Sequence, residues 1–160
     1  MRKTNVVEYV DRLGLQADTT YNNKSYLFLF IEIDNRDKSV LTSMIKRLLN
    51  RHIPLVWYNS SKGTHIISPA LLPLQKWIRL CRASQEIYPN PFYLHDVIRI
   101  STKIKDGKTI YSENADTKGI YKVSNDLLKI LELRFKTKLP FPNRVKTPLT
   151  LFGNGNLVLN

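Results

Sequence analysis

Two carboxylates end one of the most hydrophobic stretches of the chain. Residues 26–34 read YLFLFIEID, a pattern typical of a buried strand that ends in Glu32 and Asp34. Because side chains alternate along a strand, the two acids point to the same face, with Cα atoms roughly 6.5 Å apart. Carboxylates at this spacing suit a shared divalent ion, although many strands simply end in solvated acids. The stretch is the first candidate for a functional site.

A turn farther along the chain has the composition of a phosphate-binding loop. Residues 59–65 read NSSKGTH. Gly63 allows the backbone to approach a phosphate closely, while Ser61 offers a hydroxyl, Lys62 a positive charge and His65 an imidazole. The alternative is a plain hairpin turn, because such turns commonly contain the same residue types. The turn is the second candidate, as a nucleotide-binding site.

A third group of reactive side chains stands in residues 94–99, which read LHDVIR. It consists of Asp96 and Arg99. An aspartate that begins a strand is ordinarily a solvated edge residue. Its significance therefore depends on the two stretches described above.

Local patterns predict the elements that position these side chains. Apolar residues at spacings of three and four predict a helix over 40–49, with Asn35 or Asp37 as its N-cap. The segments 53–58 and 64–68 read as strands, and the short turn between them predicts an antiparallel hairpin. This helix and hairpin bring the turn back toward the acids.

The rest of the chain is expected to add helices and extended segments to one domain of residues 1–160, with a core over 26–135. The order of elements predicts an α+β fold, a mixed or antiparallel sheet with flanking helices. The remaining expected elements are a helix over 5–13 ended by Gly14, a loop over 16–25, a helix over 73–81, an extended segment over 92–104, a hairpin turn at Asp106-Gly107, a helix from Ser124 or Asn125 to 135, and an extended, proline-containing arm over 136–160.

Composition favours an intracellular protein with an anionic partner. The formal net charge is +12, with a pI near 9.9, and a basic groove gains affinity for nucleic acid by releasing counterions from phosphates. Cys81 is the only cysteine, which excludes an intramolecular disulfide and a cysteine-based zinc site. No apolar run is long enough for a signal peptide or a membrane span. We expect a cytoplasmic protein without zinc and without a membrane partner.

Taken together, the three stretches resemble the catalytic core of the archaeo-eukaryotic primase superfamily in a minimal form. The family's first motif is a hydrophobic strand with two acids, matched by FIEID at 30–34. Its second motif is a small-residue turn with a basic residue, glycine and histidine, matched by NSSKGTHII at 59–67. Its third motif is an acid ahead of an arginine-containing strand, matched by Asp96 and Arg99. The resemblance covers roughly residues 26–101 and implies an RRM-like catalytic unit of the primase-polymerase type.

What the resemblance implies is template-directed nucleotidyl transfer with two Mg²⁺ or Mn²⁺ ions, which synthesises or extends primers on single-stranded DNA from NTP or dNTP. The implied metal ligands are Glu32, Asp34 and Asp96. The implied nucleotide-binding residues are Ser61, Lys62, Gly63, His65 and Arg99. Asp106, Glu113 and Asp116 remain alternatives for the third ligand. A second primase subunit or a helicase is a possible protein partner.

Basic residues outside the motifs are candidates for a template groove. They are Arg79, Arg82, Lys103, Lys105 and Lys108. Trp57, Tyr58 and Trp77 are candidates for base stacking, although aromatic residues at these spacings are more often part of a core.

Two other classes of function stay open. One is a catalytically inactive, primase-like subunit that binds nucleic acid in a replication complex. The other is a metal-dependent nuclease or replication initiator. The nuclease is disfavoured because the sequence has no His-x-His pair and no lysine two residues after the Glu32-Ile33-Asp34 acids.

Overall fold

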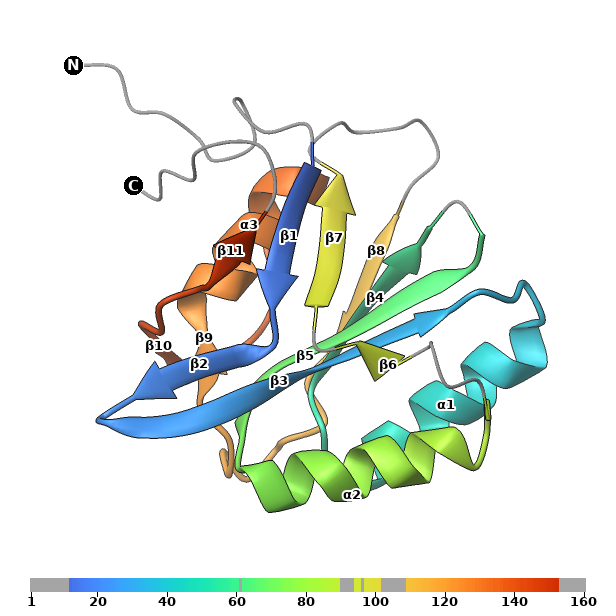
Figure 1. Cartoon of the computed structure of the whole chain (residues 1–160), viewed down its shortest axis with the longest axis horizontal. Helices are drawn as coiled ribbons and strands as arrows, with labels where there is room; N and C mark the ends of the chain where they lie inside the picture. Colours follow the sequence, from blue (N-terminus) through green and yellow to red (C-terminus); the bar gives the residue numbers. More distant parts are fainter. Residues whose placement is uncertain (1–11, 61, 90–93, 96, 102–108, 153–160) are drawn as a thin grey trace.

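The structure is a computed structural model that describes residues 12–60, 62–89, 94–95, 97–101 and 109–152. Within them the fold is α+β, as predicted, with a curled mixed sheet of eight strands and a second sheet of three (Figure 1). The helices are α1 (Lys38–Asn50), α2 (Leu74–Gln85) and α3 (Asn125–Phe135). The strands are β1 (Arg12–Gln16), β2 (Asp18–Tyr21), β3 (Lys24–Ile33), β4 (Leu55–Asn59), β5 (Thr64–Leu72), β6 (Leu94–His95), β7 (Val97–Ser101), β8 (Ile110–Glu113), β9 (Val123–Ser124), β10 (Arg144–Val145) and β11 (Leu151–Phe152).

Strand β3, which carries the first motif, is central in the larger sheet. It pairs with β5 on one side and with β2 and β6 on the other, and all of these pairings are antiparallel. β4 pairs with the far edge of β5, so the spatial order across the middle of the sheet is β6-β3-β5-β4. The β9–β10 pairing is parallel, which makes the sheet mixed.

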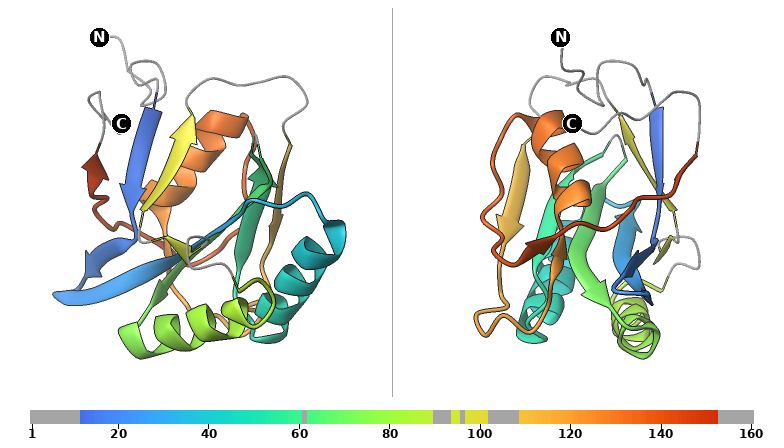
Figure 2. Two further views of the ribbon diagram at one scale, coloured as in Figure 1. Left: turned by 45° about the vertical axis from the view of Figure 1, so that its right-hand side comes forward. Right: turned by 90° about the vertical axis from the view of Figure 1, so that its left-hand side faces the viewer.

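The two faces of β3 contribute to two different hydrophobic clusters. Phe28 and Phe30 point into a cluster that α3, β1 and β7 also line. Leu29, Ile31 and Ile33 point to the opposite face, into a cluster with α1 and α2. Figures 1 and 2 show α1 and α2 on one side of the central strands and α3 on the other. The predicted alternation of side chains along this strand is therefore confirmed.

Helix α1 begins and ends as the local sequence predicts. Asp37 is its N-cap, and the Asp37 carboxylate accepts hydrogen bonds from the backbone N–H and the hydroxyl of Ser39, at 2.9 and 2.7 Å. These hydrogen bonds lower the pKa of Asp37 below its ordinary value. Met44 and Leu48 are fully buried on the sheet side of the helix. The position of α1 fixes the return path of the chain to β4.

Trp77 of α2 has a structural role rather than an exposed position for base stacking. Phe28 lies between the part of β3 that pairs with β2 and the part that pairs with β6. Its carbonyl accepts a hydrogen bond of 3.0 Å from Trp77 Nε1. The indole thereby satisfies a backbone group that neither edge strand reaches, and it anchors α2 to the sheet.

The prediction for the N-terminal segment is wrong where the structure describes it. Most of the expected helix over 5–13 lies outside the described residues, but its last residues belong to β1, with Gly14 inside the strand. The expected loop over 16–25 contains β2 and the start of β3. Asn22 and Asn23 join these strands with φ of 49° and 61°, a two-residue turn in the left-handed conformation that asparagine tolerates.

The expected hairpin turn at Asp106-Gly107 lies outside the described residues. The described strands that precede and follow it, β7 and β8, belong to different sheets. β7 pairs with β1 in the three-stranded sheet, whereas β8 pairs with β4 in the larger one. Burial is the reason, because Ile98 and Ile100 of β7 pack in the same cluster as Leu15 of β1.

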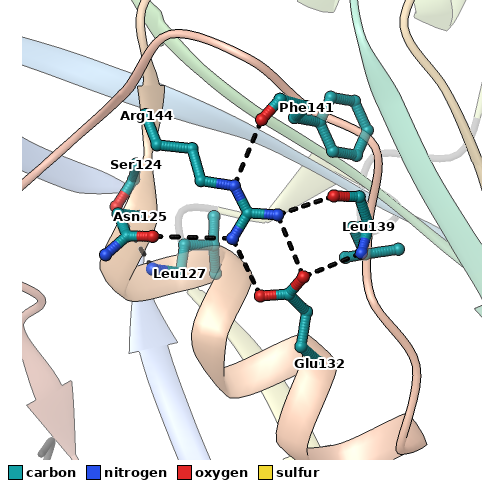
Figure 3. A network of polar contacts seen from close by, with 7 residues as sticks. All are labelled: Ser124, Asn125, Leu127, Glu132, Leu139, Phe141 and Arg144. Atoms are coloured by element: carbon teal, nitrogen blue, oxygen red, sulfur yellow. Dashed lines mark hydrogen bonds and ion pairs between the residues drawn. The ribbon is translucent and has the colours of Figure 1, made fainter.

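The C-terminal arm is packed into the fold over its described part. Leu139 and Phe141 are buried in the cluster around α3. Arg144 donates two hydrogen bonds to the Glu132 carboxylate, of 2.8 and 2.9 Å, and others to the carbonyls of Leu139 and Phe141 (Figure 3). Outside the range 26–135, β1, β2 and the arm also contribute buried residues. The described part of the arm ends in the short strand β11.

The helices of the described residues are too short or too polar to cross a membrane.

Candidate functional site

Glu32 and His65 come from two different sequence motifs and face each other directly. They are paired residues in the antiparallel ladder of β3 and β5, so their side chains stand side by side on one face of the sheet. His65 Nε2 lies 3.7 Å from Glu32 Oε1, and the two side chains are 13% and 31% exposed. The face is the one that carries Phe28 and Phe30, opposite α1 and α2. The register of two strands thus joins the acid motif to the turn motif.

Tyr58 extends this pair into a row across three neighbouring strands. Tyr58 of β4 is paired with His65 of β5, as His65 is with Glu32 of β3. The Tyr58 hydroxyl lies 3.2 Å from His65 Nδ1, and the two rings meet edge to face with centroids 5.3 Å apart. The sequence motifs gave Tyr58 no role beyond base stacking. Its place was nonetheless readable, since a hairpin that closes at residues 59 and 64 puts 58 opposite 65.

The Tyr58 side chain is held deep in the fold. Only 5% of the residue is exposed, and its ring packs against Phe135 at the end of α3, with centroids 4.7 Å apart. Burial raises the pKa of the Tyr58 hydroxyl far above its ordinary value; the nearby charge of Arg134 opposes this shift and that of Glu32 adds to it. The hydroxyl is therefore protonated throughout the physiological pH range.

The turn between β4 and β5 packs directly on the end of β3. A Cβ atom added to Gly63 would lie 1.7 Å from the carbonyl oxygen of Ile33 and 2.8 Å from the amide of Asn35. Only glycine permits this approach. The Gly63 N–H donates to Ser60 Oγ at 3.1 Å, so this amide already has a partner within the turn. The glycine has a structural explanation, and phosphate binding by its amide stays a prediction.

Two further candidate side chains of the first two motifs, Asp34 and Lys62, are exposed. Asp34 lies one residue beyond the end of β3, and Lys62 lies in the turn. Ser61 lies outside the described residues. A hollow of about 260 Å³ opens beside the turn, lined by Asn35, Arg36, Asp37, Lys38, Leu41, Asn59, Ser60, Gly63 and Thr64. Because Leu41 of α1 lines it, this hollow is on the helix side of the sheet and is distinct from the face of Glu32 and His65.

The third carboxylate of the predicted site lies outside the described residues, as does Asp106. Asp96 follows β6, where His95 is paired with Phe30 of β3. Arg99 is part of the second sheet, where it is paired with Gly14, and its side chain is not among those described. The structure thus brings the strand before Asp96 next to the acid-bearing strand.

Two alternatives for the third ligand are placed away from Glu32. Glu113 is paired with Leu55, three residues along β4 from Tyr58 and on the opposite face. Asp116 is buried, and its two carboxylate oxygens accept hydrogen bonds from the amides of Ile120 and Tyr121. Asp116 therefore stabilises a loop, and neither residue completes a site with Glu32.

The chemistry of the acids fits a hard divalent cation, although the described residues alone do not form a full ligand set. Glu32 and Asp34 offer carboxylate oxygens, the ligands that Mg²⁺ and Mn²⁺ prefer. Among the described residues, which exclude Asp96, no three side chains of His, Cys, Asp or Glu come together as a metal-binding group.

The two predicted template-binding residues that the structure describes lie away from this face. Arg79 and Arg82 are exposed on α2, which covers the opposite side of the sheet. Lys103, Lys105 and Lys108 lie outside the described residues. A contribution of the two arginines to a groove that includes Glu32 would require the nucleic acid to wrap around the edge of the sheet.

Comparisons with protein-family models, with curated proteins and with solved structures find no match to this chain.

Proposed function

We propose that the chain is a template-dependent nucleotidyltransferase of the primase-polymerase type, which synthesises or extends primers on single-stranded DNA. The observation that carries the proposal is the direct pairing of Glu32 with His65. An acid motif and a lysine-glycine-histidine turn were identified separately in the sequence, and each has an ordinary explanation alone. Because the two motifs meet on one face of the sheet, a single site explains why both are present.

The topology supports the same reading. From β3 to β6 the chain runs β-α-β-β-α-β, with the spatial strand order β6-β3-β5-β4 and both helices on one face. This order agrees with the split β-α-β arrangement and supports an RRM-like unit. We assign the RRM-like unit of the primase-polymerase type to these six elements. Glu32 and His65 lie on the face without α1 and α2.

Each residue has a role that matches its chemistry. Glu32 and Asp34, with Asp96, would hold two Mg²⁺ or Mn²⁺ ions, which would supply positive charge for the triphosphate and for the attacking 3′-hydroxyl. Lys62 is an exposed cation that reaches phosphate oxygens, with Ser61 and Arg99 as further partners. His65 donates a hydrogen bond to a phosphate oxygen beside Glu32. The net charge of +12 favours binding of the template backbone.

The test is incorporation of labelled NTP or dNTP on an unprimed and on a primed single-stranded DNA template. We expect incorporation that requires the template and Mg²⁺ or Mn²⁺, that stops when EDTA removes the ion, and that returns when excess ion is added. Omission of the template is the matched control for untemplated addition.

Two outcomes would overturn the proposal in favour of the other classes of function. Intact binding of single-stranded DNA without incorporation of any nucleotide, with either ion, would indicate a non-catalytic subunit. Metal-dependent cleavage of the template, lost in a tyrosine-to-phenylalanine variant, would indicate a nuclease or replication initiator.

A further inference from the structure

The Tyr58 hydroxyl is a buried polar group whose observed partner is a predicted substrate-binding side chain. Buried hydroxyls in folded proteins make hydrogen bonds, and this one lies 3.2 Å from His65 Nδ1. The ring is fixed from the other side by Phe135, so the hydroxyl has a defined position. A phenylalanine would fill the same space in the cluster. The oxygen therefore calls for an explanation beyond packing.

The direction of this hydrogen bond determines which imidazole nitrogen carries the proton. The buried Tyr58 hydroxyl is protonated, and His65 Nδ1 is the partner observed for it; in a neutral imidazole, Nδ1 accepts this proton when the hydroxyl donates. The proton of the neutral imidazole is then on Nε2. Nε2 is the nitrogen that faces Glu32, at 3.7 Å from its carboxylate. A donor is thus directed at the place where the proposed function puts a triphosphate.

We propose that Tyr58 is a positioning residue, whose hydroxyl holds the His65 ring in the Nε2–H tautomer and aims this N–H at a phosphate oxygen of a nucleoside triphosphate bound next to Glu32. This inference rests on the proposed function for the identity of the ligand. The hydrogen bond between Tyr58 and His65 does not depend on which ligand binds. Loss of the hydroxyl removes the hydrogen bond at Nδ1, so that the neutral ring also populates the Nδ1–H tautomer, which presents no donor at Nε2.

The variant Tyr58→Phe tests the inference because it removes one oxygen and keeps the ring. Tyr111→Phe is the matched control, since Tyr111 on the adjacent strand β8 is half exposed and stacks on Trp57. The first readout is the long-range ¹H–¹⁵N spectrum of the histidine side chains at alkaline pH, with His65 identified by its loss in His65→Asn. We expect the Nε2–H pattern in the wild type and in Tyr111→Phe, and averaging between tautomers in Tyr58→Phe.

The second readout is the affinity for a labelled nucleoside triphosphate in a double-mutant cycle. We expect Tyr58→Phe to weaken binding about tenfold when His65 is present, and to have no further effect in the His65→Asn background. A purely structural role for Tyr58 would weaken binding by the same factor in both backgrounds.

The outcomes separate this inference from the proposed function. An unchanged His65 spectrum in Tyr58→Phe, or equal effects on binding with and without His65, would overturn the positioning role alone. Absence of triphosphate binding by the wild type, with the His65 spectrum still dependent on Tyr58, would overturn the proposed function and with it the ligand named here.

Discussion

At the scale of single residues, the candidate site depends on the close packing of backbone segments as much as on reactive side chains. Glu32, His65 and Tyr58 form their row because three strands hold one register. That register ends at the turn, where Gly63 packs on the backbone of Ile33. A side chain at Gly63 would push the turn away from the acid-bearing strand. The glycine thus lets the turn pack directly against the acid-bearing strand.

We predict that Gly63→Ala lowers the free energy of unfolding by about 3 kcal/mol, because the new methyl overlaps backbone atoms that cannot move aside. Chemical denaturation measures the loss. Gly119→Ala is the comparison: the nearest atom there is in the flexible Asn143 side chain and φ is +66°, so the expected loss is about 1 kcal/mol. Equal stability of Gly63→Ala and the wild type would contradict the packing described for the turn.

At the scale of elements, the C-terminal arm is fastened to α3 by a charged network rather than by apolar contact alone. Glu132 accepts hydrogen bonds from Arg144 and from the Leu139 amide (Figure 3). Burial raises the pKa of Glu132, but the hydrogen bonds from Arg144 and Leu139 and the charges of Arg144 and Lys138 lower it more, so the net pKa is below 4.5. Phe135, which packs on Tyr58, belongs to the same helix.

This network should make stability depend on pH in acid. A lowered pKa in the folded state stabilises the fold above the ordinary value of 4.5, and this contribution is lost as pH falls through the folded-state pKa. We predict that Glu132→Gln costs about 2 kcal/mol of unfolding free energy at pH 7 and that its difference from the wild type shrinks below pH 4.5.

Glu86→Gln is the matched control for this prediction. Glu86 also pairs with an arginine, Arg47, at 2.6 Å, but its side chain is 70% exposed. Water screens such a pair, so we expect a loss of less than about 0.5 kcal/mol. Two results would contradict the role given to Glu132. One is a similar loss of unfolding free energy in Glu132→Gln and Glu86→Gln; the other is a loss in Glu132→Gln that is unchanged at pH 3.

At the scale of the whole molecule, the sequence predicts the elements whose signals are local. Strand β3, helix α1, the β4–β5 hairpin and the Ser124 cap of α3 follow from alternation, helical spacing and capping residues, and all are present. These elements contain Glu32 and His65. The local signals therefore sufficed to identify the pair, and the alternation along β3 predicted the face of Glu32.

Long-range pairing accounts for the errors. β1 pairs with β7, so residue 14 meets residue 99, and no local pattern reveals such a partner. In the same way, local patterns do not reveal that β7 joins the three-stranded sheet while β8 joins the larger one. Tyr58 was missed as a site residue because its role depends on cross-strand register rather than on motif.

The central claim is that Glu32 and His65 serve one catalytic site, and nucleotide incorporation by paired variants tests it most directly. The test variants are Glu32→Gln and His65→Asn. Their matched controls are Glu113→Gln, an exposed acid on the opposite face, and His52→Asn, an exposed histidine with φ of 60° that asparagine accepts. With all four proteins shown to be folded by circular dichroism, we predict at least about a 100-fold loss of incorporation in each test variant and wild-type rates in both controls. Wild-type incorporation by folded Glu32→Gln or His65→Asn would contradict it.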